Sequence, residues 1–303
     1  MSAAIEINGL RKVYDGGIVA VDGVSLSIDA GEVYGLLGHN GAGKSTTVEI
    51  LEGHRQRTGG TASVLGIDPA HGGRALRDRI GIVLQTSGIE NSLSVREAIA
   101  IYGAGYARRR PLDEVLALAG LSAQADQRIG TLSGGQRRRI DLALGIVGYP
   151  DVLFLDEPTT GFDPSARRSA WDVVRQLGSG GTTVLLTTHY LDEAEHLADR
   201  VGVIAAGRLV AEGTPAELVG ASAATVVRFE LPAATEGLDA VLPHGASRRG
   251  GVVEFSTATP TADVHRLCAW AVAHDVELAS LSVQRPSLED AFLALAGEQD
   301  GES

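Results

Sequence analysis

The sequence predicts an α/β fold followed by a smaller α+β domain. Apolar runs of strand length alternate with helical stretches through the first part of the chain. A glycine-rich loop, Gly38 to Thr46, stands between one such strand and the helix that follows it. From about residue 221 a second series of strands and helices begins without another loop of this kind. We therefore expect two domains, over residues 1–220 and 221–303.

The composition is that of a globular protein with an acidic surface. Hydrophobic residues make up 44% of the 303 residues, which is ample for a core, and the formal net charge is −12. That charge argues against a general affinity for nucleic acid or anionic lipid. Cys268 is the single cysteine, so an intramolecular disulfide and a cysteine-built metal site are excluded.

Neither a signal peptide nor a membrane-spanning helix is expected. The start of the chain lacks the basic and apolar regions of a signal peptide. No apolar run approaches the ~18 residues that a membrane helix needs. We therefore expect a cytoplasmic protein that reaches a membrane only through a partner.

Short β-rich runs open the chain and are separated by turns. Ile5 to Ile7, Val19 to Val21 and Val24 to Ile28 predict an antiparallel edge sheet that leads into the next strand. Tyr14 lies in the first connection. Its spacing favours a surface or core aromatic, although a ring upstream of a phosphate loop could also stack on a base.

The glycine-rich loop has the form G-x-x-x-x-G-K-[ST], which is typical of a phosphate-binding loop. The buried strand Val33 to Leu37 precedes it and a helix from Ser45 to Glu52 follows, so the loop lies at a helix N-terminus that favours anions. The Lys44 ammonium would reach the β- and γ-phosphates and the Ser45 hydroxyl would face Mg²⁺. A strand–helix turn without a ligand is the alternative. The candidate nucleotide-binding residues here are Gly38, His39, Asn40, Gly41, Ala42, Gly43, Lys44, Ser45 and Thr46.

Gln85 ends the next predicted strand, Ile80 to Leu84. An amide at the carboxyl end of a strand points towards the ligand edge of an α/β sheet. Taken by itself, a polar residue that simply ends a strand is the simpler interpretation. A helical stretch is expected over residues 94–122, with Ser94 and Glu97 forming a capping box.

A second anion-binding helix start is predicted at Leu132 to Gln136. Ser133, Gly134 and Gly135 stand where a helix running from about Arg137 to Val147 would begin. The alternative is an N-cap with flexible neighbours that binds nothing.

Two adjacent carboxylates end the apolar strand that starts at Val152. Successive side chains of a strand face opposite ways, so Asp156 and Glu157 should not share one role. One could hold Mg²⁺ with Ser45 while the other orients an attacking water. A strand end that merely reaches solvent would explain one carboxylate more readily than two.

Asp163 is a plausible cap for the helix that follows. The buried strand Thr182 to Thr188 ends at His189, which by itself would more often be structural than catalytic. In the C-terminal part, strands are expected over 225–231, 251–256 and 276–284, and helices over 261–273 and 287–295.

Together these elements resemble the nucleotide-binding subunit of an ATP-binding cassette (ABC) transporter over residues 4–218. Many ATPases carry a phosphate loop alone, but this full order of motifs is specific to that family. The matching positions are Tyr14, Walker A at 38–46, the coupling-loop Gln85, the signature at 132–136, Walker B at 152–157, the D-loop at 161–163, with Phe162 where leucine is commoner, and the switch His189.

The resemblance implies a P-loop NTPase cassette. Its mixed central sheet, antiparallel edge sheet and helical subdomain, at about 86–148, would be joined by the small C-terminal α+β domain. Residues 285–293 resemble the end of the exporter branch that includes daunorubicin-resistance-like ATPases. An importer is less compatible with a C-terminal domain of this kind.

The resemblance also implies roles for residues. Tyr14 would stack on adenine, and Ser45, Gln85 and Asp156 would organise Mg²⁺. Glu157 would be the general base and His189 would sense the γ-phosphate. The remaining implied contacts to ATP come from Ser133, Gly134, Gly135, Gln136 and Asp163, the signature being contributed by a second cassette.

The implied partners are a second cassette, identical or paralogous, and a separate transmembrane permease. The permease would place the protein at the inner face of the cell membrane. No nucleic acid is expected as a partner.

One rival function is that of a soluble cassette ATPase acting on ribosomes or DNA. Such proteins usually carry two cassettes or a long coiled-coil insertion, and this sequence has neither. Another rival is a regulatory protein that uses ATP as a switch, against which the presence of both Glu157 and His189 argues.

Overall fold

The computed structural model of the protein has two compact units, Met1–Pro215 and Ala216–Ser303. The division falls close to the boundary expected after residue 220. The structure describes residues 3–83, 88–221, 224–231, 237–243, 245–284, 287–289 and 292.

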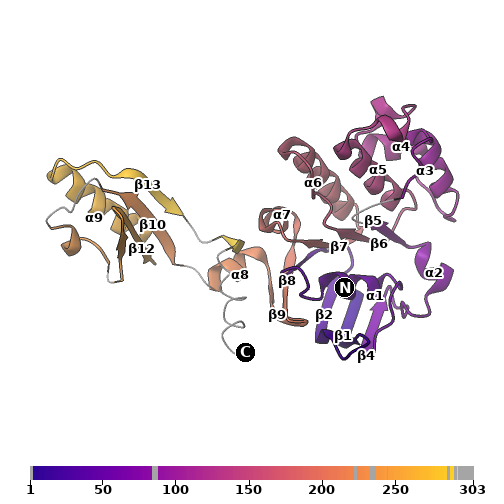
Figure 1. The fold of residues 1–303 in the computed structure, drawn as a ribbon, viewed down its shortest axis with the longest axis horizontal. Coiled ribbons are helices and arrows are strands. Elements are labelled where there is room, and N and C mark those ends of the chain that lie inside the picture. The colour runs from indigo at the N-terminus through magenta and orange to yellow at the C-terminus, as the bar shows by residue number, and fades with distance from the viewer. Residues whose placement is uncertain are drawn as a thin grey trace. The chain divides into compact units, whose positions relative to one another are not determined.

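A six-stranded sheet forms the centre of the first unit (Figure 1). Neighbouring strands are parallel except for the antiparallel pair at one edge, β8 and β9. Parallel strands align their carboxyl ends, so the segments that follow β3, β6 and β7 meet at one edge. The strand order is β5 (Ile80–Val83), β6 (Val152–Asp156), β7 (Thr183–Thr188), β3 (Val33–Leu37), β8 (Arg200–Ala205) and β9 (Arg208–Gly213).

Each face of this sheet has its own hydrophobic core because side chains alternate along a strand. In β6, Leu153 and Leu155 belong to one core, and Val152 and Phe154 belong to the other. The first core includes residues of α6 (Pro164–Ser179) and α7 (Leu191–Leu197), and the second includes residues of α1 (Lys44–Leu51).

A separate three-stranded antiparallel sheet is formed by β1 (Ala3–Val13), β2 (Val19–Asp29) and β4 (Gly59–Val64) in the order β2-β1-β4. The short runs expected here are parts of two long strands. Gly9 and Gly23 have positive φ, and the pairing of β1 with β2 shifts register close to both glycines. Such irregularities interrupt the side-chain alternation without ending the strand.

Helices α3 (Val95–Gly103), α4 (Leu112–Leu118) and α5 (Gly134–Ile146) pack together on the first core (Figure 1). The helical stretch expected over 94–122 consists of two helices, α3 and α4, with a connection between them. Pro111 is the N-cap of α4 at the end of the connection from α3, and a proline disfavours helix in the residue before it. The Ser94–Glu97 capping box is present. The short helices of this unit are α2 (Gly73–Arg77), η1 (Ser122–Gln124) and η2 (Ile129–Thr131).

The second unit contains an antiparallel sheet in the order β11-β12-β10-β13 with α9 (Pro260–Ala273) against it. Leu267 and Trp270 of α9 share a core with Val227, Phe229 and Phe255. Most of the helix expected over 287–295 lies outside the described residues. The other bounds are α8 (Pro215–Ala221), β10 (Thr225–Glu230), η3 (Leu238–Ala240), β11 (Ser247–Arg249), β12 (Val252–Thr257) and β13 (Ala279–Gln284).

Within the part of the chain that the structure describes, none of the helices combines the length and the apolar character needed to cross a membrane.

Candidate functional site

A cleft of about 380 Å³ opens where the segments after β3, β6 and β7 meet. It brings together most of the predicted loop, both predicted carboxylates and the predicted histidine, which come from three distant parts of the sequence. The lining residues are Ala20, Asn40, Gly41, Gly43, Lys44, Ser45, Thr46, Asp156, Glu157 and His189. Gly38, His39 and Ala42 belong to the loop but do not line the cleft.

Two glycines of the loop are required by close contacts with neighbouring main chain. A Cβ on Gly43 would lie 2.4 Å from the Ala20 carbonyl oxygen, and one on Gly38 would lie 2.4 Å from the Ile204 carbonyl oxygen. Gly43 also has φ 108° and immediately precedes α1. The first-turn N–H groups of α1 have no partners within the helix, so the cradle suits an anionic phosphate.

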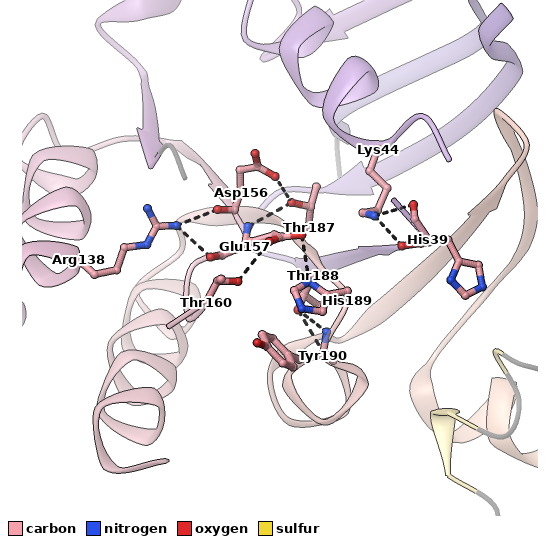
Figure 2. A network of polar contacts seen from close by, with 11 residues as sticks. His39, Lys44, Arg138, Asp156, Glu157, Thr160, Thr187, Thr188, His189 and Tyr190 are labelled. Carbon is pink, nitrogen blue, oxygen red and sulfur yellow. Dashed lines mark hydrogen bonds and ion pairs between the residues drawn. The ribbon is translucent and has the colours of Figure 1, made fainter. Parts of the chain in front are cut away.

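Lys44 is buried at the base of the cleft. Its Nζ donates to the carbonyl oxygens of Gly38 and His39, at 2.6 and 3.1 Å (Figure 2). Burial lowers the pKa of Lys44, and the nearby Glu157 and Asp156 carboxylates oppose that change. The cleft therefore combines a desolvated cation with two carboxylates, a charge arrangement that suits a polyphosphate accompanied by a cation.

Asp156 and Glu157 differ in partners because the strand ends between them. Asp156 is the last residue of β6, and its Oδ1 accepts a hydrogen bond from the Thr187 hydroxyl of β7. Glu157 has φ 47°, and its N–H donates to the Thr187 carbonyl at 3.0 Å. The expectation that both residues lie on the strand is corrected, since a left-handed turn at Glu157 separates the two side chains.

The Glu157 carboxylate contacts two side chains. Its Oε1 lies 3.0 Å from Nδ1 of His189, and its Oε2 accepts a hydrogen bond from the Thr160 hydroxyl at 3.2 Å (Figure 2). Only 14% of the Glu157 side chain is exposed, against 41% for His189, whose ring lies 4.1 Å from that of Tyr190. A shielded carboxylate beside a titratable ring can accept and pass on a proton.

Sequence reasoning missed Thr160, Thr187 and Arg138 around these carboxylates. Thr160 lies close to Glu157 in sequence and could have been found as a local hydroxyl. Thr187 is opposite Asp156 only because of the register between β6 and β7. Arg138, on α5, donates to main-chain carbonyls at the end of β6, a contact that no local pattern shows.

Tyr14 lies beside the loop helix and outside the cleft lining. Its hydroxyl is 3.1 Å from the Thr46 hydroxyl, and Lys12 and Arg55 lie over its ring at 5.2 and 5.1 Å from the centroid. The ring is half-buried and is absent from both cores of this unit.

The predicted second helix start is on the surface of the chain. Ser133 caps α5 and forms a capping box with Gln136, while Ser133 and Gly134 are exposed. The helix begins at Gly134, earlier than expected. These residues, with Gly135, do not line the cleft.

Of the remaining predicted site residues, Asp163 does not line the cleft and Gln85 is not among the described residues. Asp163 caps α6: its Oδ1 accepts from the N–H groups of Ser165 and Ala166, and these bonds lower its pKa. Gln85 lies outside the described residues. Among the described residues, the loop, the two carboxylates and the histidine therefore line the cleft without the Ser133 tip or Asp163.

Mg²⁺ is bound in proteins by few oxygen ligands together with phosphates and waters. Ser45 and Asp156 both face the cleft and offer such oxygens. Among the described residues there is no cluster of three His, Cys, Asp or Glu side chains that would form an all-protein metal site. The donor set present fits a magnesium ion carried by a phosphate ligand.

The fold and cleft define a P-loop nucleotide-binding cassette. Residues 21–160 match the family model described as ABC transporter. Residues 225–287 match a second model, described as the C-terminal domain of ABC transporter domain-containing protein-like sequences.

Curated relatives extend this match over nearly the whole chain. The daunorubicin/doxorubicin resistance ATP-binding protein DrrA of Streptomyces peucetius is 43% identical, over 97% of this chain and 92% of that protein. The Nod factor export ATP-binding protein I of Burkholderia lata is 43% identical, over 72% of this chain and 73% of that protein. The solved structure of cbiO1 from Clostridium perfringens, part of the transporter complex cbiONQ, has 29% identity and a TM-score of 0.65, over 73% of this chain and 92% of that chain.

The chain belongs to the ATP-binding subunits of ABC transporters, in the branch of the daunorubicin-resistance proteins. It is an ATPase that powers a transporter. The fold class and the family expected from the sequence are thereby confirmed.

Proposed function

We propose that this chain binds MgATP in the cleft, hydrolyses it with Glu157 as general base, and drives a separate membrane permease that exports a drug-like or lipid-like cargo. The observation that carries the proposal is the arrangement of the cleft. It places the phosphate loop, the Lys44 cation and the Glu157–His189 pair around one volume.

Binding would use the main chain first. N–H groups of the loop and of the first turn of α1 would contact the phosphate oxygens, and Lys44 would exchange its loop carbonyls for the β- and γ-phosphates. Tyr14, whose hydroxyl meets Thr46 at the start of α1, would stack on adenine. Ser45, Asp156 and Gln85 would hold Mg²⁺, which supplies charge neutralisation at the phosphates when it is bound.

Hydrolysis requires a group that takes a proton from water. The water oxygen forms a bond to the γ-phosphorus as the bond between that phosphorus and the β–γ bridging oxygen breaks, which leaves ADP and phosphate. Glu157 would accept the proton, because its carboxylate is shielded and held by Thr160. His189 would contact the γ-phosphate and would lose that contact when the phosphate leaves.

A second cassette would complete the site. One chain offers the loop and the carboxylates, while its Ser133–Gln136 helix tip is exposed on its own surface. In a pair, each tip, with Asp163, would cover the nucleotide of the other chain, so ATP would favour the closed dimer and hydrolysis would release it.

The cargo class is inferred from the relatives. One is a daunorubicin/doxorubicin resistance protein that matches along nearly the whole chain, and another serves Nod factor export. One name concerns drug resistance and the other concerns export. Together they favour an exporter over an importer or a ribosome- or DNA-associated switch. We place the protein in the cytoplasm, at the inner face of the cell membrane, through its permease.

The proposal is tested with Glu157→Gln. The amide keeps the size and the hydrogen bond with Thr160 but cannot act as a base, so MgATP binding should persist. Turnover should fall by about 100-fold or more, the usual effect of removing a positioned acid–base group. Steady-state phosphate release and a nucleotide titration are the measurements. Hydrolysis by the variant at the wild-type rate would remove Glu157 from this role.

A further inference from the structure

Arg138 joins α5 to the main chain that carries the two carboxylates. Its buried guanidinium, 8% exposed, donates through Nη2 to the carbonyl oxygens of Asp156 and Glu157, at 3.0 and 2.9 Å (Figure 2). Its Nε donates to the carbonyl oxygen of Pro158, at 3.3 Å. A single side chain therefore provides donors to three consecutive carbonyl groups.

These carbonyls lie where β6 ends and the chain turns. Glu157 has φ 47°, a left-handed conformation that a non-glycine residue holds only when its surroundings impose it. Its N–H is bound by the Thr187 carbonyl of β7, and its C=O is bound by Arg138 of α5. The peptide groups on both sides of the Glu157 side chain are thus held by different elements.

The guanidinium is itself held in place. Nη1 of Arg138 lies 3.6 Å from Oδ2 of Asp141, which is on the same face of α5 and is also buried. This ion pair balances the buried charge and orients the plane of the guanidinium towards β6. An ammonium group in the same position could not reach three separate acceptors, because lysine lacks the planar fork of arginine.

We propose that Arg138 is a positioning residue that aims the Glu157 carboxylate into the cleft and couples its placement to the Ser133 tip of α5. Ser133 caps α5 and Arg138 lies in its second turn, so a displacement of the tip is carried to the carbonyls of residues 156–158. In a closed pair, contact of the tip with the nucleotide of one site would adjust the base of the other site. The inference rests on the proposed function.

The first test is the separation of turnover from binding in Arg138→Met, measured in the full-length chain assembled with its permease. The nucleotide ligands are untouched, so the dissociation constant and KM for MgATP should remain within about 2-fold of wild type. Loss of the aim of Glu157 should lower kcat about 10-fold or more, as expected for an interaction made in the transition state. Arg138→Lys keeps the ion pair with Asp141 and should recover part of the lost kcat.

The matched control is Arg137→Met, on the same helix. Arg137 is exposed, and it donates to the Gly130 carbonyl rather than to the end of β6. Its kcat should stay within about 2-fold of wild type. A wild-type kcat for Arg138→Met would overturn the positioning role. The role would also be overturned if Arg138→Met lost kcat and nucleotide affinity equally while Arg138→Lys kept the wild-type kcat. Failure of the wild type to hydrolyse ATP at all would instead remove the proposed function.

The coupling is tested by a double-mutant cycle on kcat with Ser133→Ala and Arg138→Met. If one helix transmits both effects, the double variant should lose less activity than the product of the two single losses. A double loss equal to that product means that the two residues act independently, and the coupling is then wrong even if the positioning role stands.

Discussion

The Lys44 ammonium group donates to two loop carbonyls, and the carboxylates of Asp156 and Glu157 lie near enough to affect its charge. On nucleotide binding, the phosphates would replace the two loop carbonyls, which are weaker partners of the Lys44 ammonium group. That ammonium group is already desolvated before the nucleotide binds. The same burial that lowers the pKa of Lys44 makes its bonds to a phosphate strong, since a desolvated charge interacts more strongly with a partner.

We predict that Lys44→Ala weakens MgATP binding by about 10- to 100-fold. Hydrogen bonds to charged groups contribute about 1.5–3 kcal/mol, and 1.4 kcal/mol corresponds to a tenfold change in affinity. Titration with a fluorescent ATP analogue measures the effect. Arg11→Ala, which removes an exposed cation paired with Asp22, is the control and should bind as wild type. An unchanged dissociation constant for the Lys44 variant would contradict this role.

Glu52 is a buried carboxyl group at the end of α1. Burial first, and then the Asp156 and Glu49 carboxylates, raise its pKa to about 8. The folded state therefore holds a proton that the unfolded state releases near the ordinary value of 4.5. This contribution to stability is complete below that value, and it is lost as the pH rises towards 8.

We predict that Glu52→Gln raises the resistance to urea above that of the wild type, and that this gain is larger at pH 9 than at pH 5.5. The amide mimics the protonated carboxyl group and has no charge to bury at high pH. Because one pKa unit corresponds to about 1.4 kcal/mol, the gain in unfolding free energy at pH 9 should exceed about 1 kcal/mol. Equal differences between variant and wild type at both pH values would show that Glu52 does not titrate in this range.

At the scale of elements, the close approach of α5 to β5 determines where the Ser133 tip and Arg138 lie. Gly81 of β5 faces Gly145 of α5, and a Cβ on Gly81 would lie 2.0 Å from the Gly145 carbonyl oxygen. Helix and strand can therefore approach this closely only with glycine at position 81. The packing places α5 near enough to β6 for Arg138 to reach the end of that strand.

We predict that Gly81→Ala destabilises the first unit by about 1–3 kcal/mol, the usual cost of overpacking a core. Helix α5 would have to move away from β5, so kcat should fall as well. Urea unfolding and phosphate release measure the two effects. Gly88→Ala is the control, since a Cβ there would have none of the described atoms within 4 Å. A Gly81 variant with wild-type stability would mean that α5 and β5 are packed less tightly than described.

At the scale of the whole molecule, the chain consists of units with separate cores. Among the described residues, the two cores of the first unit draw on residues 4–209, and the core of the second draws on residues 227–278. None of these cores is shared. Each unit thus has the apolar contacts that an independently folding domain needs.

We predict that deletion of residues 221–303 leaves a folded first unit that binds MgATP. We also expect it to weaken ATP-dependent pairing, on the hypothesis that the C-terminal unit braces the dimer. Light scattering in the Glu157→Gln background, with and without MgATP, measures the pairing. Unaltered pairing of the truncated chain would reject the bracing role, and loss of nucleotide binding would show that the first unit needs the second.

Local patterns were sufficient for the phosphate loop, the Ser94 and Ser133 caps and the strands that lead into the cleft. Glycine spacing, cap chemistry and apolar runs act within a few residues, so they can be read from adjacent positions. Local pattern did not locate the interruption within the helical stretch 94–122, where the structure has two helices. The second helix begins directly after Pro111, which disfavours helix in the residue before it.

The sequence by itself determined the family, the fold class and the residue types of the cleft, because these depend on motifs that are contiguous in the chain. Only the tertiary structure decided how the carboxylates are held. The pairing of Asp156 with Thr187 and the three carbonyl contacts of Arg138 join residues that are far apart in sequence. The left-handed backbone of Glu157 lies between these contacts. Such contacts arise from strand register and helix packing, which no single stretch of sequence encodes.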